Sequence, residues 1–119
     1  MNVFVMLNDQ HLKDGKWNQY YKCKQNYYDL FCNPEILDFS EHCETAWEEC
    51  SSYPGIRALI NRPTSIKWQY MDEFLKDFGP EEVTGFKARV IQHEMDHLVG
   101  IDLIKKAEAI YIKNDKLRA

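Results

Sequence analysis

The sequence predicts an α+β fold in which antiparallel strands pack around one central helix. From Val3 to Met71, runs rich in valine, isoleucine and aromatic residues alternate with turn residues, which is typical of strands. After Thr84, the apolar residues follow a helical spacing instead. The chain has 119 residues, enough for one domain, so we expect 1–119 to form a single domain.

Five stretches are expected to form the strands. Residues 2–7 alternate loosely and are rich in valine and phenylalanine. Residues 27–39 are expected to form a strand that is interrupted at Asn33-Pro34, because proline removes a donor from the sheet. The remaining strands are expected within 40–50, 56–60 and 65–71, and loops or hairpins within 8–26 and 72–82.

A principal helix is expected between Thr84 and Gly100. Thr84 suits the N-cap position, and glycine is a common helix terminator. The apolar residues at helical spacing are Phe86, Val90, Ile91, Met95, Leu98 and Val99. The tail 102–119 is expected to contain a short second helix.

The composition excludes several classes of protein. Fifteen Lys and Arg oppose nineteen Asp and Glu, so no basic surface for direct readout of nucleic acid is expected. No apolar run approaches the roughly 20 residues that cross a bilayer. The start, "MNVFVMLNDQ", has no positively charged region of a signal peptide. We therefore expect a cytoplasmic protein, or one of an organelle matrix if the source is eukaryotic.

The stretch "QHEMDHLVG", residues 92–100, indicates a metal site on the principal helix. His93 and His97 are four residues apart and share one face of a helix, so both can bind one ion. Glu94 lies about 100° further around the helix, where it can take a proton from water activated by the ion. A solvated helix that carries these charges by chance is the alternative.

A catalytic metal site needs a third protein ligand. The chain has four cysteines, and in a reducing compartment free thiols act as core residues or as metal ligands. Cys50 is favoured because it ends an expected strand just before a turn, and Cys43 is a weaker competitor. Asp96 is expected at the surface or near a ligand imidazole, and Gln92 is expected to be a polar helix residue.

These motifs resemble those of the peptide deformylase family. "QHEMDHLVG" is similar to the family's third motif, and "EECSSYPG", residues 48–55, to its second motif, usually written EGCLS and followed shortly by proline. "NPEIL", residues 33–37, and "GFKARVIQHEMDHLVG", residues 85–100, are similar to the family's preceding strand and its helix. The resemblance extends from about Val3 to Ile104.

The resemblance implies an enzyme that removes the N-formyl group from the initiator methionine of nascent peptides. Cys50, His93 and His97 would hold one divalent metal ion, with Fe²⁺ expected and Zn²⁺ or Ni²⁺ as possible replacements. Glu94 would move the proton, and the backbone N–H of Ser51 would stabilise the developing oxyanion.

The resemblance also implies a binding site for the formyl-methionyl nascent peptide. The peptide backbone would pair with the strand after the second motif, and the methionine side chain would enter an apolar pocket. The implied substrate-binding residues are Ala46, Glu48, Tyr53, Arg57, Phe86 and Val90. Plain core packing is the alternative for Phe86 and Val90, and a solvated strand arginine is the alternative for Arg57.

Two features of the chain depart from the family pattern. The family's first motif, GxGLAAxQ, and the helix before it do not occur, so we expect a truncated domain that lacks one oxyanion donor. Glu49 and Ser51 replace the glycine and leucine of the second motif. If that glycine has a positive φ or allows close approach of the substrate, Glu49 would be strained or obstructive.

Three functions therefore stay open. They are an active short deformylase, an impaired deformylase-like scaffold subunit that associates with the ribosome, and a different zinc hydrolase such as a small peptidase. An apolar face is expected to be covered by a second chain, by dimerisation, or by the tyrosine-rich segment 11–28.

Overall fold

The fold consists of two antiparallel sheets and one main helix. The computed structural model describes residues 1–17, 27–49 and 53–112. The elements are β1 (Val3–Leu7), β2 (Tyr28–Phe39), β3 (Cys43–Glu49), β4 (Ile56–Pro63), β5 (Ser65–Met71), β6 (Asp77–Thr84), α1 (Gly85–Leu98), α2 (Leu103–Lys106) and β7 (Ala109–Ile112). The predicted α+β class with antiparallel strands is confirmed.

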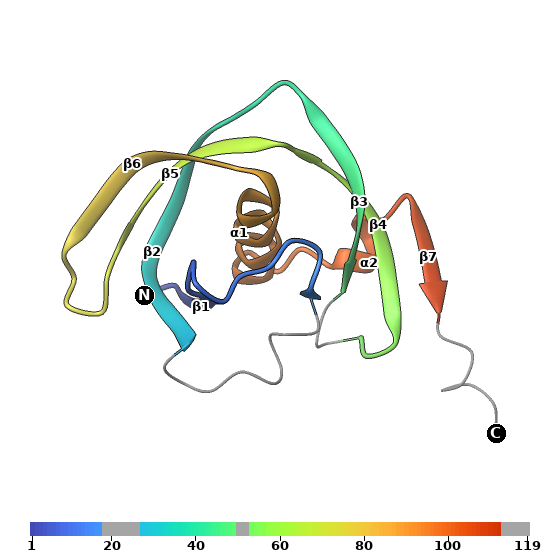
Figure 1. Ribbon diagram of the computed structural model, residues 1–119, viewed down its shortest axis with the longest axis horizontal. Helices are drawn as coiled ribbons and strands as arrows, with labels where there is room; N and C mark the ends of the chain where they lie inside the picture. The colour runs from blue at the N-terminus through green and yellow to red at the C-terminus, as the bar shows by residue number, and fades with distance from the viewer. Residues whose placement is uncertain (18–26, 50–52, 113–119) are drawn as a thin grey trace.

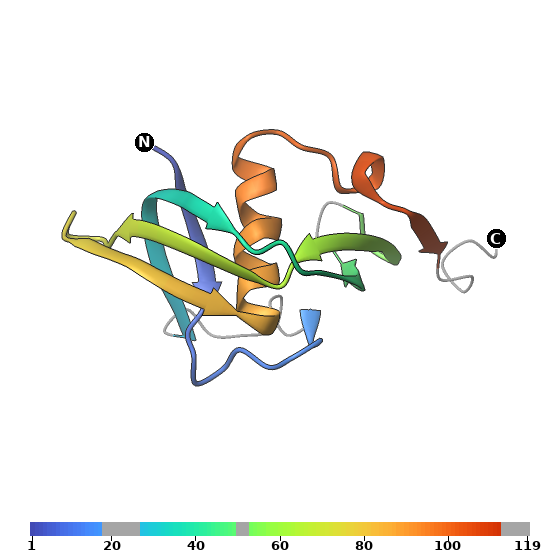
Figure 2. The ribbon, with the colours of Figure 1, turned by 90° about the horizontal axis from the view of Figure 1, so that it is seen from above.

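The central helix α1 lies between the two sheets (Figures 1 and 2). One sheet has four strands in the order β1-β2-β5-β6, and the other has three in the order β3-β4-β7. In Figure 1 the strands curve around α1, which is seen almost along its axis. The sheets therefore surround the helix that carries the two histidines, as predicted for strands packed around one central helix.

Two chain segments pass from one sheet to the other and form an arch over the start of α1. One segment is β2 followed by β3, and the other is β4 followed by β5. Where they cross, the backbone N–H of Ser40 donates to Ser65 O (2.9 Å), and the N–H of Thr64 donates to His42 O (3.0 Å). Gly85 N–H also donates to Thr64 O (3.0 Å), so the first residue of α1 is bound to this arch.

The main core lies between α1 and the four-stranded sheet. The rings of Phe4 and Phe31 stack at 5.3 Å between centroids, and both lie near Trp68, at 6.2 and 5.2 Å. Val90 and Ile91 of α1 are fully buried against this cluster. Their burial confirms the helical face predicted from the apolar spacing, although Val99 at its end is two-thirds exposed.

The structure corrects three details of the predicted elements. Strand β2 continues through Asn33-Pro34, because a bulge absorbs the proline; the pairing with β5 shifts between Cys32 and Glu35, and Asn33 has a φ of 47°. Strand β4 likewise continues to Pro63, where a break was predicted. The tail contains the predicted short helix, α2, but also a strand, β7, on the edge of the smaller sheet.

Residues 72–82 form a hairpin, one of the two predicted alternatives. The tip lies between β5 and β6, and the N–H of Asp72 donates to Lys76 O (2.9 Å). Thr84 is the N-cap of α1 by position, but its side chain makes no capping hydrogen bond. In the described part of the chain, no helix combines the length and the apolar character needed to cross a membrane.

Two glycines with similar backbone geometry differ in their surroundings, and this difference predicts unequal effects of alanine. Gly79 has φ +95° and a Cβ there would lie 2.7 Å from Trp68 O, whereas Gly100 has φ +77° and open space. We expect Gly100→Ala to lower the free energy of unfolding by about 1–2 kcal/mol, through the left-handed conformation alone. Gly79→Ala should lower it by a further ~1–3 kcal/mol, because the backbone must shift. Urea denaturation measures both, and equal losses would contradict the predicted clash.

Candidate active site

Helix α1 brings the two predicted histidine ligands together. The rings of His93 and His97 lie 4.7 Å apart between centroids, at an interplanar angle of 48°. His93 is buried and His97 is exposed, so the pair connects the interior of the protein with its surface. Glu94 is half-buried and follows His93 directly. The shared helix face predicted from the four-residue spacing is confirmed.

Glu48 of β3 orients the buried imidazole. Its Oε1 lies 2.9 Å from His93 Nδ1, and its carboxylate has no solvent exposure. A carboxylate acts as the acceptor, so Nδ1 carries the proton, and in the neutral imidazole the lone pair is then on Nε2. A metal-binding histidine is held in this way in known sites, because the second ring nitrogen donates to a carboxylate.

Two arginines hold the same carboxylate. Arg62 of β4 donates from Nε to Oε2 (2.6 Å) and from Nη2 to Oε1 (2.9 Å), a bidentate pair. Arg89 of α1 donates from Nη1 to Oε2 (2.6 Å). The Glu48 carboxylate therefore receives hydrogen bonds from three side chains on two elements, β4 and α1.

These contacts keep Glu48 ionised in the protein interior. Burial by itself would raise the pKa of the carboxyl group, because it disfavours the charged form. Hydrogen bonds from His93 and Arg62, together with the charge of Arg62, outweigh burial and lower the pKa to about 2. The pKa of Arg62 is raised in turn, since its ion pairs with Glu48 and Asp96 exceed the opposing effect of burial.

Asp96 completes the charge balance of this cluster. Its Oδ2 accepts from Arg62 Nη1 (2.8 Å) and from Lys106 Nζ (3.0 Å), and its side chain is largely buried. The cluster therefore joins two carboxylates with two guanidinium groups and the ammonium group of Lys106. From the sequence, Asp96 was expected at the surface or near a ligand imidazole; the structure places it half-buried, with its carboxylate bound to Arg62 and Lys106.

Arg89 and Gln92 also attach α1 to backbone carbonyl groups of the strands. Arg89 donates to Ile60 O (3.0 Å) and to Glu44 O (2.6 Å). Gln92 donates to Pro63 O (3.0 Å) and is itself buried. The helix is thus fixed to β3 and β4 by Arg89, one turn before His93, and by Gln92, directly before it.

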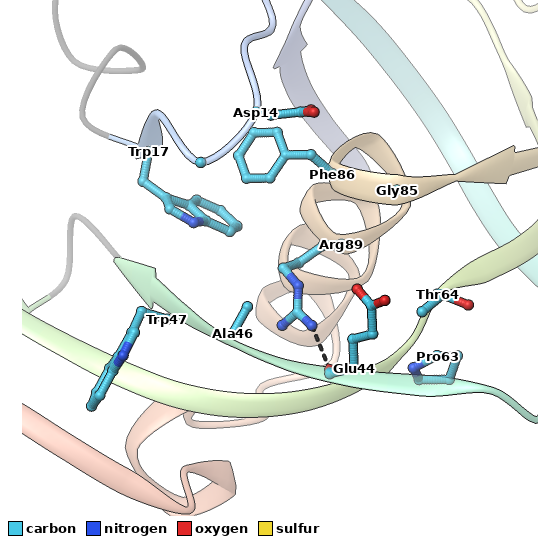
Figure 3. A pocket seen from close by; sticks show the side chains of 11 residues that line it. Asp14, Trp17, Glu44, Ala46, Trp47, Pro63, Thr64, Gly85, Phe86 and Arg89 are labelled. Carbon is cyan, nitrogen blue, oxygen red and sulfur yellow. Dashed lines mark hydrogen bonds between the residues drawn. The ribbon is translucent and has the colours of Figure 1, made fainter.

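A cavity of about 350 Å³ opens beside this face of α1 (Figure 3). The structure places two predicted substrate-binding residues in its wall, Ala46 and Phe86. Its lining residues are Asp14, Gly15, Trp17, Glu44, Ala46, Trp47, Pro63, Thr64, Gly85, Phe86 and Arg89. Val90 is fully buried in the main core and is not among the lining residues, and its contact with substrate stays a prediction.

The remaining predicted substrate-binding residues have protein partners. Arg57 lies on the opposite face of the smaller sheet from Glu48 and forms an ion pair with Glu49, from Nε to Oε1 at 2.7 Å. Tyr53 donates its hydroxyl hydrogen to Asp102 Oδ1 (3.2 Å). Glu49 belongs to an extended strand; the non-glycine residues of positive φ in the described part are Asn33 and Leu75, so the expected backbone strain is absent.

The predicted third metal ligand, Cys50, and the predicted oxyanion donor, Ser51, lie outside the described residues. Within residues 1–17, 27–49 and 53–112, no group of three or more His, Cys, Asp and Glu side chains is placed to hold a metal ion. Two observations fit a metal here: the two imidazoles are adjacent, and Glu48 orients one of them. Cys43, the competitor, is exposed at the start of β3, and its thiol donates to Glu41 O.

Sequence reasoning missed the two buried arginines and Trp17. Arg62 shares a face of β4 with the buried Ala58 and Ile60, so strand alternation was the available signal. Arg89 lies four residues before His93 on the helix and therefore on the same side. Trp17 is buried within a polar stretch and gave no periodic signal.

Comparisons with known proteins agree on one family. The family model described as polypeptide deformylase matches residues 1–111. The peptide deformylase of Natranaerobius thermophilus is 39% identical over 85 residues, which are 66% of this chain and 50% of the relative. The chain spans about half the length of the curated relatives it matches.

Solved structures agree with this family. The structure of the Thermotoga maritima peptide deformylase superposes with a TM-score of 0.66 at 38% identity, over 71% of this chain and 57% of that chain. A Met-Ala-Ser-bound class I type b peptide deformylase from Acinetobacter baumannii gives a TM-score of 0.70 at 28% identity, over 88% and 62%.

The Glu48 contacts predict a large effect from a small substitution. Glu48→Gln leaves the buried Arg89 without its carboxylate partner and Arg62 with Asp96 alone, so the free energy of unfolding should fall by about 3–5 kcal/mol. Metal affinity should fall roughly 10–100-fold, because His93 loses its orienting acceptor. Urea denaturation and chelator competition measure the two effects. Glu49→Gln is the matched control, since its ion pair on the outer face should contribute less than about 1 kcal/mol; equal losses in the two variants would contradict the role of Glu48.

Proposed function

Because the chain belongs to the polypeptide deformylase family, we propose that it is a metal-dependent hydrolase that removes the N-formyl group from the initiator methionine of nascent peptides. One observation carries the proposal: the Glu48 carboxylate orients His93, beside His97 and directly before Glu94. The Met-Ala-Ser found on the Acinetobacter baumannii relative supports a methionyl peptide as the ligand class.

His93, His97 and Cys50 are the residues we propose to hold one divalent ion. A thiolate and two imidazoles suit Fe²⁺, the expected metal, and also Zn²⁺ or Ni²⁺. When bound, such an ion supplies Lewis acidity, which lowers the pKa of water and polarises a carbonyl oxygen. The exposure of His97 leaves one side of this pair open to solvent, from which water and peptide can approach.

Glu94 is the proposed proton carrier. As a half-buried carboxylate next to His93, it takes a proton from the attacking water and delivers it to the departing amine. The amide C–N bond breaks, the formyl carbon leaves as formate, and the peptide keeps a free amino group. The backbone N–H of Ser51 is proposed to donate to the oxygen on which negative charge develops.

The cavity beside α1 is the proposed site for the first side chain of the peptide. Ala46 and Phe86 supply apolar wall, and Glu48 lies behind them as part of the buried charge cluster. An unbranched apolar chain such as that of methionine fits this lining, since thioether sulfur makes favourable contacts with aromatic rings. The reaction belongs where formylated chains are made, in the cytoplasm or an organelle matrix.

The other functions considered from the sequence stay predictions. No specific contact in the described residues favours a scaffold subunit on the ribosome, a partner chain or a small peptidase. The experiment below also separates them from a deformylase.

Substitution of Glu94 tests the proposed function. The protein is purified anaerobically with Fe²⁺ or Ni²⁺, and formate release from a formyl-methionyl peptide is measured. Glu94→Gln should lower kcat by roughly 10²–10⁴-fold, because the proton carrier is lost, while bound metal stays at one ion per chain. Glu82→Gln, at an exposed position of β6, should leave kcat unchanged. Full metal content without turnover in the unmodified chain would reject the hydrolase and favour the scaffold hypothesis.

A further inference from the structure

Trp17 is a buried residue at the end of an exposed polar stretch. Residues 13–16 are exposed, whereas the Trp17 side chain is only 6% exposed. The stretch turns at Gly15, which has a φ of 70°, and the N–H of Lys16 donates to Lys13 O (3.1 Å). Burial of one large indole therefore attaches this part of the chain to the rest of the protein.

The indole of Trp17 lines the cavity and also contacts His93, one of the proposed metal ligands. Its ring lies edge-on to Phe86, at 5.2 Å between centroids and 76° between planes. The same indole lies 4.7 Å from the ring of His93, which is on the same helix as Phe86. A buried indole with two rotatable bonds that packs against both of these rings cannot easily move aside.

Trp17 faces a small residue across the cavity. In Figure 3 the indole points from the upper left toward Ala46 of β3 and the Arg89 side chain. Arg89 directs both terminal nitrogens to Glu48 and to backbone carbonyl oxygens, so it does not draw a charged group into the cavity. The cavity, of about 350 Å³, is at the lower end for ligand pockets, and Trp17 is one of the two tryptophans in its wall.

We propose that Trp17 is a specificity-determining residue: its indole forms the wall that admits a flexible, unbranched first side chain such as that of methionine and excludes an aromatic one. This inference rests on the proposed function, because it assigns the first residue of a formylated peptide to the cavity. It adds a determinant from the chain before β2, outside the second and third motifs.

The test compares two formylated tripeptides that differ only in their first residue, methionine or phenylalanine. Binding is measured by calorimetry on metal-loaded protein in the Glu94→Gln background, so that the peptides stay intact. The unmodified pocket should bind the methionine peptide at least tenfold more tightly. Trp17→Ala should raise the affinity for the phenylalanine peptide relative to methionine by roughly 10–100-fold, the range over which apolar pockets discriminate.

Leu12→Ala is the matched control. Leu12 precedes Trp17 in the same loop and packs against the same core cluster, but it does not line the cavity. It should destabilise the loop without changing the ratio of the two affinities. Trp17→Phe guards against a variant that fails to fold: it keeps an aromatic ring against Phe86, removes part of the wall, and should give an intermediate ratio.

The outcomes separate the inference from the proposed function. Equal affinity for both peptides in the unmodified pocket overturns the inference, as does the same change of ratio in Trp17→Ala and Leu12→Ala. If formate is released from the methionine peptide but Trp17→Ala leaves the ratio of the two peptide affinities unchanged, the function stands and the inference fails. If no formate is released but the binding ratio shifts as expected, the inference stands and the function fails.

Discussion

The structure depends on one buried carboxylate, that of Glu48. An isolated ion in the interior would cost several kcal/mol, but Glu48 receives hydrogen bonds from Arg62, Arg89 and His93. These partners come from β4 and from two successive turns of α1, so a single group on β3 fixes the helix relative to the smaller sheet. The same carboxylate orients the imidazole of His93 in the proposed metal site. Loss of Glu48 should therefore lower both the stability of the fold and the affinity for metal.

Local patterns in the sequence predicted the helix and its histidines well. Their spacing of four residues places His93 and His97 on one face whatever surrounds the helix, and the structure confirms this. The buried partner of His93 was harder to predict, because it depends on how β3 packs against α1. An arginine in a strand, such as Arg62, suggests a solvated position, and its partner Glu48 is not the residue opposite it, because the register pairs Arg62 with Glu44. The third ligand, Cys50, stays a prediction from the motif and the family resemblance.

The errors in the fold have similar causes. Proline at position 34 suggested a broken strand, but a bulge with positive φ at Asn33 keeps β2 continuous. Strand β7 was missed although Ile110, Tyr111 and Ile112 favour a strand, because a run of four residues is short and its pairing depends on the edge of β4. Trp17 was missed because its neighbours are polar; its burial follows from a hydrophobic surface formed by residues far along the chain, including Phe86 and His93.

The arch over α1 has a consequence for how the molecule loses its structure. The two segments that cross there, β2–β3 and β4–β5, each contribute to both sheets, and α1 begins on the same crossing. Neither sheet can come apart at the crossing without removing hydrogen-bond partners from the other. We therefore expect the described elements to melt in one all-or-none transition, with no state in which one sheet survives alone.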